Sequence, residues 1–238
     1  MIPLKDDVPS QSVPMVTIGL IALNVIAFLY QASLGIDARG PGAGADQAFV
    51  MEFGLVPCRL TGGCLVPDES PSPLLTVFTS MFLHGGLFHV GGNMLYLWIF
   101  GDNVEDTLGH GRFLLLYVVA GTAAAFAQAY LNPASRVPMI GASGAVSGVL
   151  GAYLLLFPYA TVLTLVTFGF FIRFVHIPAM IVLGFWVLLQ LLNGYITFSA
   201  PSFGRGESGG VAWFAHIGGF LAGMLLLFLL RPRRNTRL

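Results

Sequence analysis

One serine, two histidines and one asparagine lie near the starts of apolar segments in this chain. Ser143 lies in the run Gly141-Ala-Ser-Gly144, and His216 lies near the start of a later apolar segment. His89 and Asn93 are four residues apart, so they share one face of a helix. Serine becomes a nucleophile when a base removes its proton, and histidine suits that role near neutral pH. These residue types predict a serine–histidine dyad.

Other hydrolytic chemistries need residues that the apolar segments lack. Asp and Glu are absent from every one of the six long charge-free windows, which excludes a mechanism based on two intramembrane aspartates. A zinc motif of the type H-E-x-x-H needs a glutamate between its histidines. His84 and His89 are five residues apart, which does not place them on one helical face as metal ligands. We therefore expect neither a metal nor a cofactor.

The composition is typical of an integral membrane protein. Of the 238 residues, 56% are hydrophobic and 9% are charged, whereas about 25% are charged in soluble domains. Lys plus Arg and Asp plus Glu number 11 each, so the chain lacks the basic excess typical of a nucleic-acid binder. We expect one integral-membrane domain over residues 1–238, with the lipid bilayer around it and no nucleic-acid partner.

Six windows without charged residues have room for membrane-spanning helices. They are 8–36, 70–101, 113–135, 137–172, 174–204 and 208–230, and a spanning helix needs about 20 mostly apolar residues. The sequence therefore predicts an all-α bundle of six transmembrane helices, at about 14–32, 86–101, 113–130, 142–157, 176–195 and 213–230. Pro158 ends the fourth helix, and 159–174 is expected to be an apolar connector at the membrane surface.

The distribution of basic residues predicts the orientation. Six spans place both termini on the same side of the membrane. If that side is cytoplasmic, the inner segments hold seven Lys and Arg residues and the outer segments hold four, as expected when positive charge is enriched on the cytoplasmic side. The tail 231–238 is then a basic cytoplasmic anchor, and 33–78 is the first outer loop. Helices two, four and six begin at the outer face, which places His89, Asn93, Ser143 and His216 at similar depth. We expect a multi-pass protein of the cell membrane whose site opens to the extracytoplasmic side.

Small residues surround the proposed nucleophile and base. Gly141, Gly144 and further small residues thin one side of the fourth helix, and Gly219-x-x-x-Gly223 lies in the sixth. Such residues let helix backbones approach closely, which a serine and an imidazole on different helices need. Elsewhere, Cys58 and Cys64 of the first outer loop either pair as a disulfide or remain two free thiols.

Three motifs together resemble the rhomboid family of intramembrane serine proteases. They are Gly141-Ala-Ser143-Gly144, His89-x-x-x-Asn93 and Ala215-His216-x-x-Gly219-x-x-x-Gly223, and the resemblance covers roughly residues 14–230. It implies a six-helix rhomboid core that cleaves transmembrane segments of single-pass or multi-pass membrane proteins near the outer face.

The resemblance also implies a role for each motif residue. Ser143 is the nucleophile, His216 is the general base, and the oxyanion is bound by His89, Asn93 and the Ser143 backbone N–H. Structural support comes from Gly141, Gly144, Gly219 and Gly223. The run Gly101-x-x-x-Glu105 is similar to the family too, where the glutamate is structural, although position alone places Glu105 and Arg112 in a solvated inner loop.

Two departures from the family pattern stand out. The first outer loop has no Trp, whereas many members carry a Trp-Arg pair there. Contacts of this loop with lipid headgroups therefore do not follow from the resemblance. Ser147 stands where many members have a tyrosine that stacks on the catalytic histidine. What orients His216 is therefore left open.

Two other function classes remain as alternatives. A catalytically silent rhomboid-like protein would bind membrane proteins without cleaving them, and it would be expected to lack the serine or the histidine. A small transporter would place polar groups near the midplane, often in inverted repeats. This chain keeps both residues and shows no repeat, which favours the protease.

Overall fold

Six helices of 14 to 22 residues form the main bundle of the protein. The structure is a computed structural model that describes residues 1–35, 44–168, 171–200 and 211–231. Each predicted helical segment holds a helix: α1 (Met15–Leu34), α5 (Leu87–Leu108), α6 (His110–Leu131), α7 (Ser143–Leu156), α8 (Ala179–Ser199) and α9 (Trp213–Leu230). The predicted tail 231–238 and most of the loop between α8 and α9 lie outside the described residues.

By length and hydropathy, up to five of these six helices are candidate membrane spans and α7 is too short. Among the described residues, α1, α6, α8 and α9 each qualify, and α5 qualifies together with a preceding segment, 73–82, that is bent against it by 82°. Helix α7 has 14 residues, which at about 1.5 Å per residue is shorter than a bilayer core of about 30 Å. The count of six crossings therefore stays a prediction.

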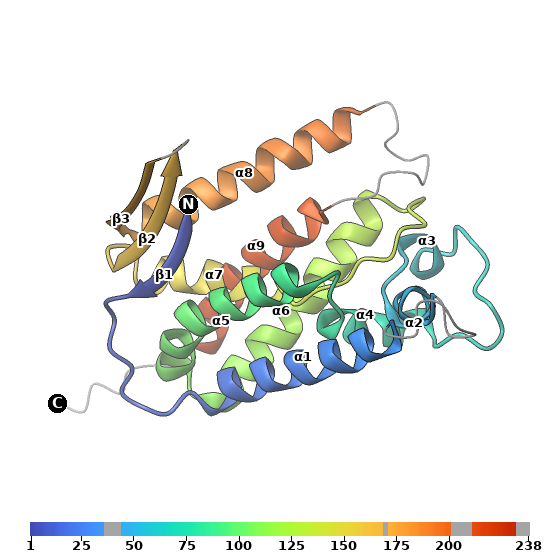
Figure 1. The fold of residues 1–238 in the computed structure, drawn as a ribbon, viewed down its shortest axis with the longest axis horizontal. Coiled ribbons are helices and arrows are strands. Elements are labelled where there is room, and N and C mark those ends of the chain that lie inside the picture. Colours follow the sequence, from blue (N-terminus) through green and yellow to red (C-terminus); the bar gives the residue numbers. More distant parts are fainter. Residues whose placement is uncertain (36–43, 169–170, 201–210, 232–238) are drawn as a thin grey trace.

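The segment between α1 and α5 contains four short helices. These are α2 (Ala45–Phe53), α3 (Pro57–Leu60), α4 (Pro73–Thr79) and the 3-10 helix η1 (Ser80–Phe82), and α2, α3 and α4 gather at one end of the bundle (Figure 1). Cys58 and Cys64 form a disulfide there. A pair of backbone hydrogen bonds between Leu55 and Met139 attaches this segment to the loop before α7.

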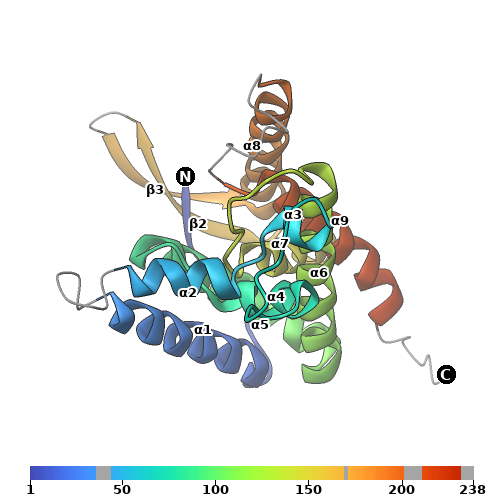
Figure 2. The ribbon, with the colours of Figure 1, turned by 90° about the vertical axis from the view of Figure 1, so that its right-hand side faces the viewer.

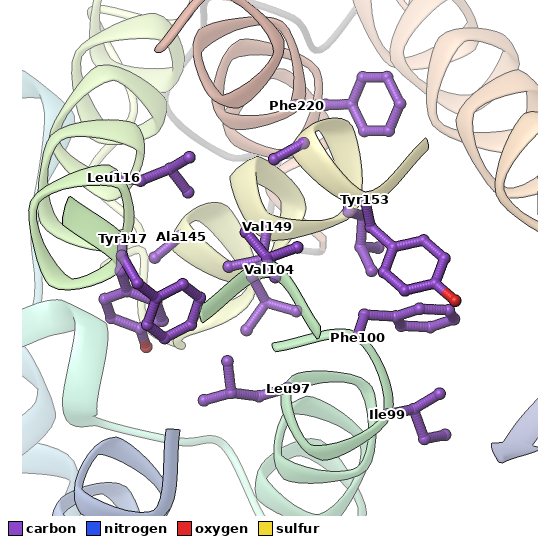
Figure 3. Close-up of a cluster of buried hydrophobic side chains, with 14 of the residues drawn as sticks. Leu97, Ile99, Phe100, Val104, Leu116, Tyr117, Ala145, Val149, Tyr153 and Phe220 are labelled. Atoms are coloured by element: carbon purple, nitrogen blue, oxygen red, sulfur yellow. The ribbon is translucent and has the colours of Figure 1, made fainter. Parts of the chain in front are cut away.

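Helix α7 lies in the middle of the bundle and forms much of its core. Every residue from Gly144 to Tyr153 is buried. Figure 3 shows Val149 and Tyr153 of α7 beside Leu97 and Phe100 of α5, and all four are fully or almost fully buried. Because α7 is covered on all sides, its first residue, Ser143, is held by a rigid element.

Helices α7 and α9 touch backbone to backbone. A Cβ on Gly219 would stand 2.1 Å from the carbonyl oxygen of Gly144, and one on Gly223 would stand 1.9 Å from that of Gly148. Real atoms do not approach so closely, so any side chain at either position would push the two helices apart. Dispersion contacts of this kind are a main source of helix association in lipid.

A three-stranded sheet was not predicted, and here the all-α prediction is wrong. Strands β1 (Ile2–Asp6), β2 (Thr161–Phe168) and β3 (Phe171–Pro178) pair antiparallel in the order β1-β2-β3. The predicted surface connector 159–174 is mostly part of the hairpin β2–β3, which projects sideways from the bundle in Figure 2. The run is rich in β-branched and aromatic residues, which favour strands, and β1 supplies the partner for its inner edge.

Glu105 does not lie in a solvated loop as position alone suggested. It falls inside α5 and is 1% exposed. Its carboxylate accepts hydrogen bonds from the backbone N–H groups of Val16 and Thr17, at 2.8 and 2.7 Å, and from the Thr17 hydroxyl. These N–H groups belong to the first turn of α1 and have no acceptor within that helix. Glu105 thus caps α1 and ties it to α5, while Arg112 is exposed as expected.

Replacing Gly223 with alanine should separate α7 from α9 and destabilise the fold. We expect Gly223→Ala to lower the free energy of unfolding by about 1–3 kcal/mol, the usual cost of overpacking, measured by thermal or denaturant unfolding in detergent. Gly184→Ala is the matched control, because a Cβ at this position on α8 meets nothing within 4 Å. Equal unfolding free energies for the two variants would contradict this packing.

The carboxyl group of Asp6 should make stability depend on pH. Burial raises its pKa to about 6, opposed by a hydrogen bond from the Tyr153 hydroxyl. The folded state therefore binds a proton more tightly than the unfolded state, so this contribution is complete below about pH 4 and is lost as the pH rises to about 6. Unfolding temperatures measured from pH 4 to 7 should fall less steeply for Asp6→Asn than for the wild type. Equal slopes of unfolding temperature against pH for the two proteins would show that Asp6 does not contribute to the pH dependence of stability.

Candidate active site

Ser143 is the first residue of α7, and Gly141, two residues before it, has a backbone conformation that favours glycine. Gly141 has φ +122°, which residues with a side chain rarely adopt, and its N–H donates to the Ser80 carbonyl at 2.9 Å. A Cβ on Gly141 would stand 2.8 Å from Nε2 of His89 and 3.6 Å from Oγ of Ser143. The missing side chain therefore leaves space that borders both groups.

His216 lies one turn into α9 and contacts Ser143. Its Nε2 is 2.8 Å from the Ser143 Oγ, inside the range of about 2.6–3.2 Å for direct proton transfer. The imidazole is 8% exposed, so little water competes for its nitrogens. The structure brings the predicted nucleophile and base together, next to the backbone contact between Gly144 and Gly219.

The other face of His216 meets α8. Its Nδ1 is 2.8 Å from Oε1 of Gln190, and the Trp186 ring lies tilted by 37° with a centroid distance of 5.7 Å. A second ring, that of Trp213, stands edge-on to the imidazole at 6.3 Å. Sequence reasoning missed Gln190, although a polar residue inside a charge-free window was a usable signal, because such a residue needs a partner or a function.

His89 and Asn93 lie on the α5 side of the same space. The N–H of Gly85 donates to Nδ1 of His89 at 3.2 Å, which leaves the ring hydrogen on Nε2, the atom beside Gly141. Asn93 is 8% exposed, and its Nδ2 has no hydrogen-bond acceptor among the described residues. Two side-chain donors on one face of α5 are thus available to a ligand.

His84 is fully buried just before α5. Its backbone N–H and carbonyl both bond the side-chain amide of Gln31 in α1, at 3.1 and 2.7 Å. Its Nε2 accepts from the N–H of Ala142 at 3.5 Å. His84 therefore connects α1 to the loop that carries Gly141 and Ser143, as a bracing residue.

A cavity of about 590 Å³ joins these groups. Ser143, His216, His89 and Asn93 all line it, among apolar and small side chains that include Phe88, Tyr96, Val146 and Trp186. Within the described residues, no group of three His, Cys, Asp or Glu side chains is placed to hold a metal ion. The arrangement places a serine hydroxyl, an imidazole and hydrogen-bond donors around one apolar space.

Comparisons with known proteins point to one family. A family model described as the Rhomboid domain matches residues 71–233. The chain belongs to the rhomboid family. It is 35% identical to RHOMBOID-like protein 1 of Arabidopsis thaliana over 159 residues, which cover 66% of this chain and 35% of that protein. It is 34% identical to Rhomboid protein 1, mitochondrial, of Saccharomyces cerevisiae over 106 residues, which cover 43% of this chain and 31% of that protein.

A bacterial relative has a higher identity over a shorter stretch. Rhomboid protease GluP of Bacillus subtilis is 44% identical over 78 residues, which cover 33% of this chain and 15% of that protein. The matched part of the chain thus spans at most 35% of the length of these three relatives. With the family and its apolar helices together, the protein is an integral, multi-pass membrane protein.

In this rhomboid protein, Ser147 stands at the position of the tyrosine and an aromatic ring from another helix lies beside His216. The Ser147 hydroxyl donates to the carbonyl of Ser143 at 2.6 Å, within α7. The ring that lies on His216 comes from Trp186 of α8 instead. Trp186 is half-buried against the imidazole, whereas its neighbour Phe185 is 45% exposed on the outside of α8.

Proposed function

We propose that this rhomboid-family protein is an intramembrane serine endopeptidase, with Ser143 as nucleophile and His216 as general base. The observation that carries the proposal is the 2.8 Å distance between Oγ of Ser143 and Nε2 of His216. As Oγ attacks the carbonyl carbon of a peptide bond, its proton passes to Nε2. The resulting imidazolium then protonates the amine that leaves, and water hydrolyses the Ser143 ester with His216 again as base.

The tetrahedral intermediate carries a negative oxygen that an apolar cavity cannot solvate. Preorganised donors are therefore needed, and we assign them to Nε2–H of His89, Nδ2 of Asn93 and the backbone N–H of Ser143. The first N–H groups of a helix have no acceptor within it, so Ser143 contributes one by its position at the start of α7. The unoccupied donor of Asn93 and the space at Gly141 support this assignment.

The proposal includes an orientation and a class of substrate. Both termini are cytoplasmic, and the site opens to the extracytoplasmic side of the cell membrane, in a single rhomboid domain with its core at about 14–230. The excess of basic residues on one side supports this, as does Figure 1, where β1 and the C-terminal end of α9 lie at the end of the bundle opposite α2, α3 and α4. Substrates are membrane proteins whose spanning segments are cleaved near the outer face, with no metal and no cofactor.

Removing either member of the dyad should abolish proteolysis. Ser143→Ala and His216→Ala should each lower turnover of a transmembrane substrate by roughly 10⁴- to 10⁶-fold, and the double variant should lose no more, because the pair acts as a unit. Cleavage in detergent or liposomes measures this loss. A fluorophosphonate probe should label the wild type and leave Ser143→Ala unlabelled.

The matched control is Ser147→Ala, which removes a buried hydroxyl one turn along α7. It should keep most of the activity, because its hydroxyl bonds only the Ser143 carbonyl in the described contacts. Near-wild-type cleavage by Ser143→Ala or His216→Ala would overturn the dyad. An intact fold with neither cleavage nor probe labelling in the wild type would instead indicate the catalytically silent alternative.

Loss of an oxyanion donor should lower turnover without weakening substrate binding. Asn93→Ala is expected to reduce kcat by about 10²- to 10³-fold, with KM nearly unchanged. His89→Ala should be more severe, because His89 also accepts the Gly85 N–H. Asn103→Ala is the control: Asn103 is a second buried asparagine on α5 that donates to the Val8 carbonyl, so its loss should affect stability alone. Full turnover by folded Asn93→Ala would place the oxyanion hole elsewhere.

A further inference from the structure

His216, the proposed catalytic base, makes hydrogen bonds to residues of two other helices. Ser143 of α7 meets one ring nitrogen of His216, and Gln190 of α8 meets the other, both at 2.8 Å. Gln190 is 6% exposed, so this second contact is also shielded from water. An unsatisfied Nδ1 in such a place would carry the full penalty of a buried polar group.

The amide of Gln190 has only one orientation that satisfies its neighbours. Its Nε2 donates to the carbonyl of Trp186, one turn earlier in α8, at 3.0 Å. Its Oε1 is then the atom that faces His216, and an oxygen accepts but does not donate. Nδ1 of His216 must therefore carry the ring hydrogen, which leaves the lone pair of Nε2 directed at the Ser143 hydroxyl.

We propose that Gln190 is a positioning residue for the catalytic base, holding His216 in the tautomer and ring orientation that can accept the Ser143 proton. The inference rests on the proposed protease function. It extends the dyad to a chain of hydrogen bonds, Ser143–His216–Gln190, in which the third member is a neutral amide on a separate helix. Gln190 itself touches neither the substrate nor the reacting atoms.

An amide suits this position better than a carboxylate does. A carboxylate there would be an ionised group inside an apolar bundle, which is expensive unless it is fully paired. The amide presents an acceptor oxygen without a net charge, and its second hydrogen bond fixes which atom faces the imidazole. Trp186 adds to the restraint, because its ring lies against His216 and limits rotation of the imidazole. Two residues one turn apart on α8 thus orient the base.

The test compares variants that differ in the acceptor at position 190. Gln190→Met keeps the length of the side chain but offers only a weak sulfur acceptor. It should lower kcat by roughly 10- to 100-fold, part of the about 10²–10⁴ that a general base contributes, with KM changed less than twofold. Gln190→Glu keeps an oxygen at the same reach and should recover most of that loss.

Asn193→Leu is the matched control on the same helix. The Asn193 amide also donates to a carbonyl four residues earlier, that of Leu189 at 2.7 Å, but this bond is exposed. Its loss should leave kcat and KM unchanged. Equal kcat for Gln190→Met and the wild type would overturn the proposal. So would equal losses in Gln190→Met and Asn193→Leu, or a change confined to KM.

A readout that needs no proteolysis separates this inference from the proposed function. Nitrogen-15 NMR of labelled histidine reports which ring nitrogen carries the hydrogen. The His216 signals should show the hydrogen on Nδ1 in the wild type, and a shift of population toward Nε2–H in Gln190→Met. An unchanged tautomer in that variant would overturn the positioning role. If the tautomer shifts while wild-type protein cleaves no substrate, the positioning of His216 stands and the protease function fails.

Discussion

The site depends on the backbone contact between α7 and α9. Gly144 and Gly219 meet where any Cβ on Gly219 would overlap a carbonyl oxygen, at 2.1 Å. Ser143 directly precedes Gly144, and His216 lies three residues before Gly219 on the same face of its helix. The distance between the side chains of Ser143 and His216 is therefore set by how closely two backbones pack. In a bilayer, where apolar surface gains little by leaving lipid, such packing must come from shape.

Polar side chains supply the remaining specificity of the bundle. Each one joins elements that are distant in sequence: Glu105 binds the first turn of α1, Gln31 binds the backbone of His84, and Gln190 binds His216. A buried polar group is stable only when its hydrogen bonds are made, so each pair favours one arrangement of its helices. Asn93 has a buried Nδ2 that lacks an acceptor in the described part of the chain. Its free donor lines the cavity, as a site for an anionic intermediate would require.

The sequence predicted the helices and the cluster at their ends, because both follow from short-range patterns. Charge-free windows locate helices of sufficient length, and the order of the helices places Ser143 and His216 at one depth. The pairing of residues 2–6 with 161–168 was missed, since it is a long-range contact that no local pattern encodes. The hairpin β2–β3 is a local contact, and its β-branched and aromatic residues were a usable signal for strands. The contact of Gln190 with His216 was missed for a related reason. Gln190 marks a polar position on a largely apolar helix, but nothing local in the sequence specifies which neighbouring helix that position faces.

The position of α8 affects both the width of the cavity and the hydrogen bonding of His216. Figure 2 shows α8 at the edge of the bundle beside α9, and many of its side chains, including Ile181 and Phe185, are exposed to the surroundings. A helix at the edge can shift more easily than α7, which is enclosed. Yet α8 carries Trp186 and Gln190, both of which contact His216. Any displacement of α8 that widens the cavity therefore also withdraws the acceptor from Nδ1 of His216.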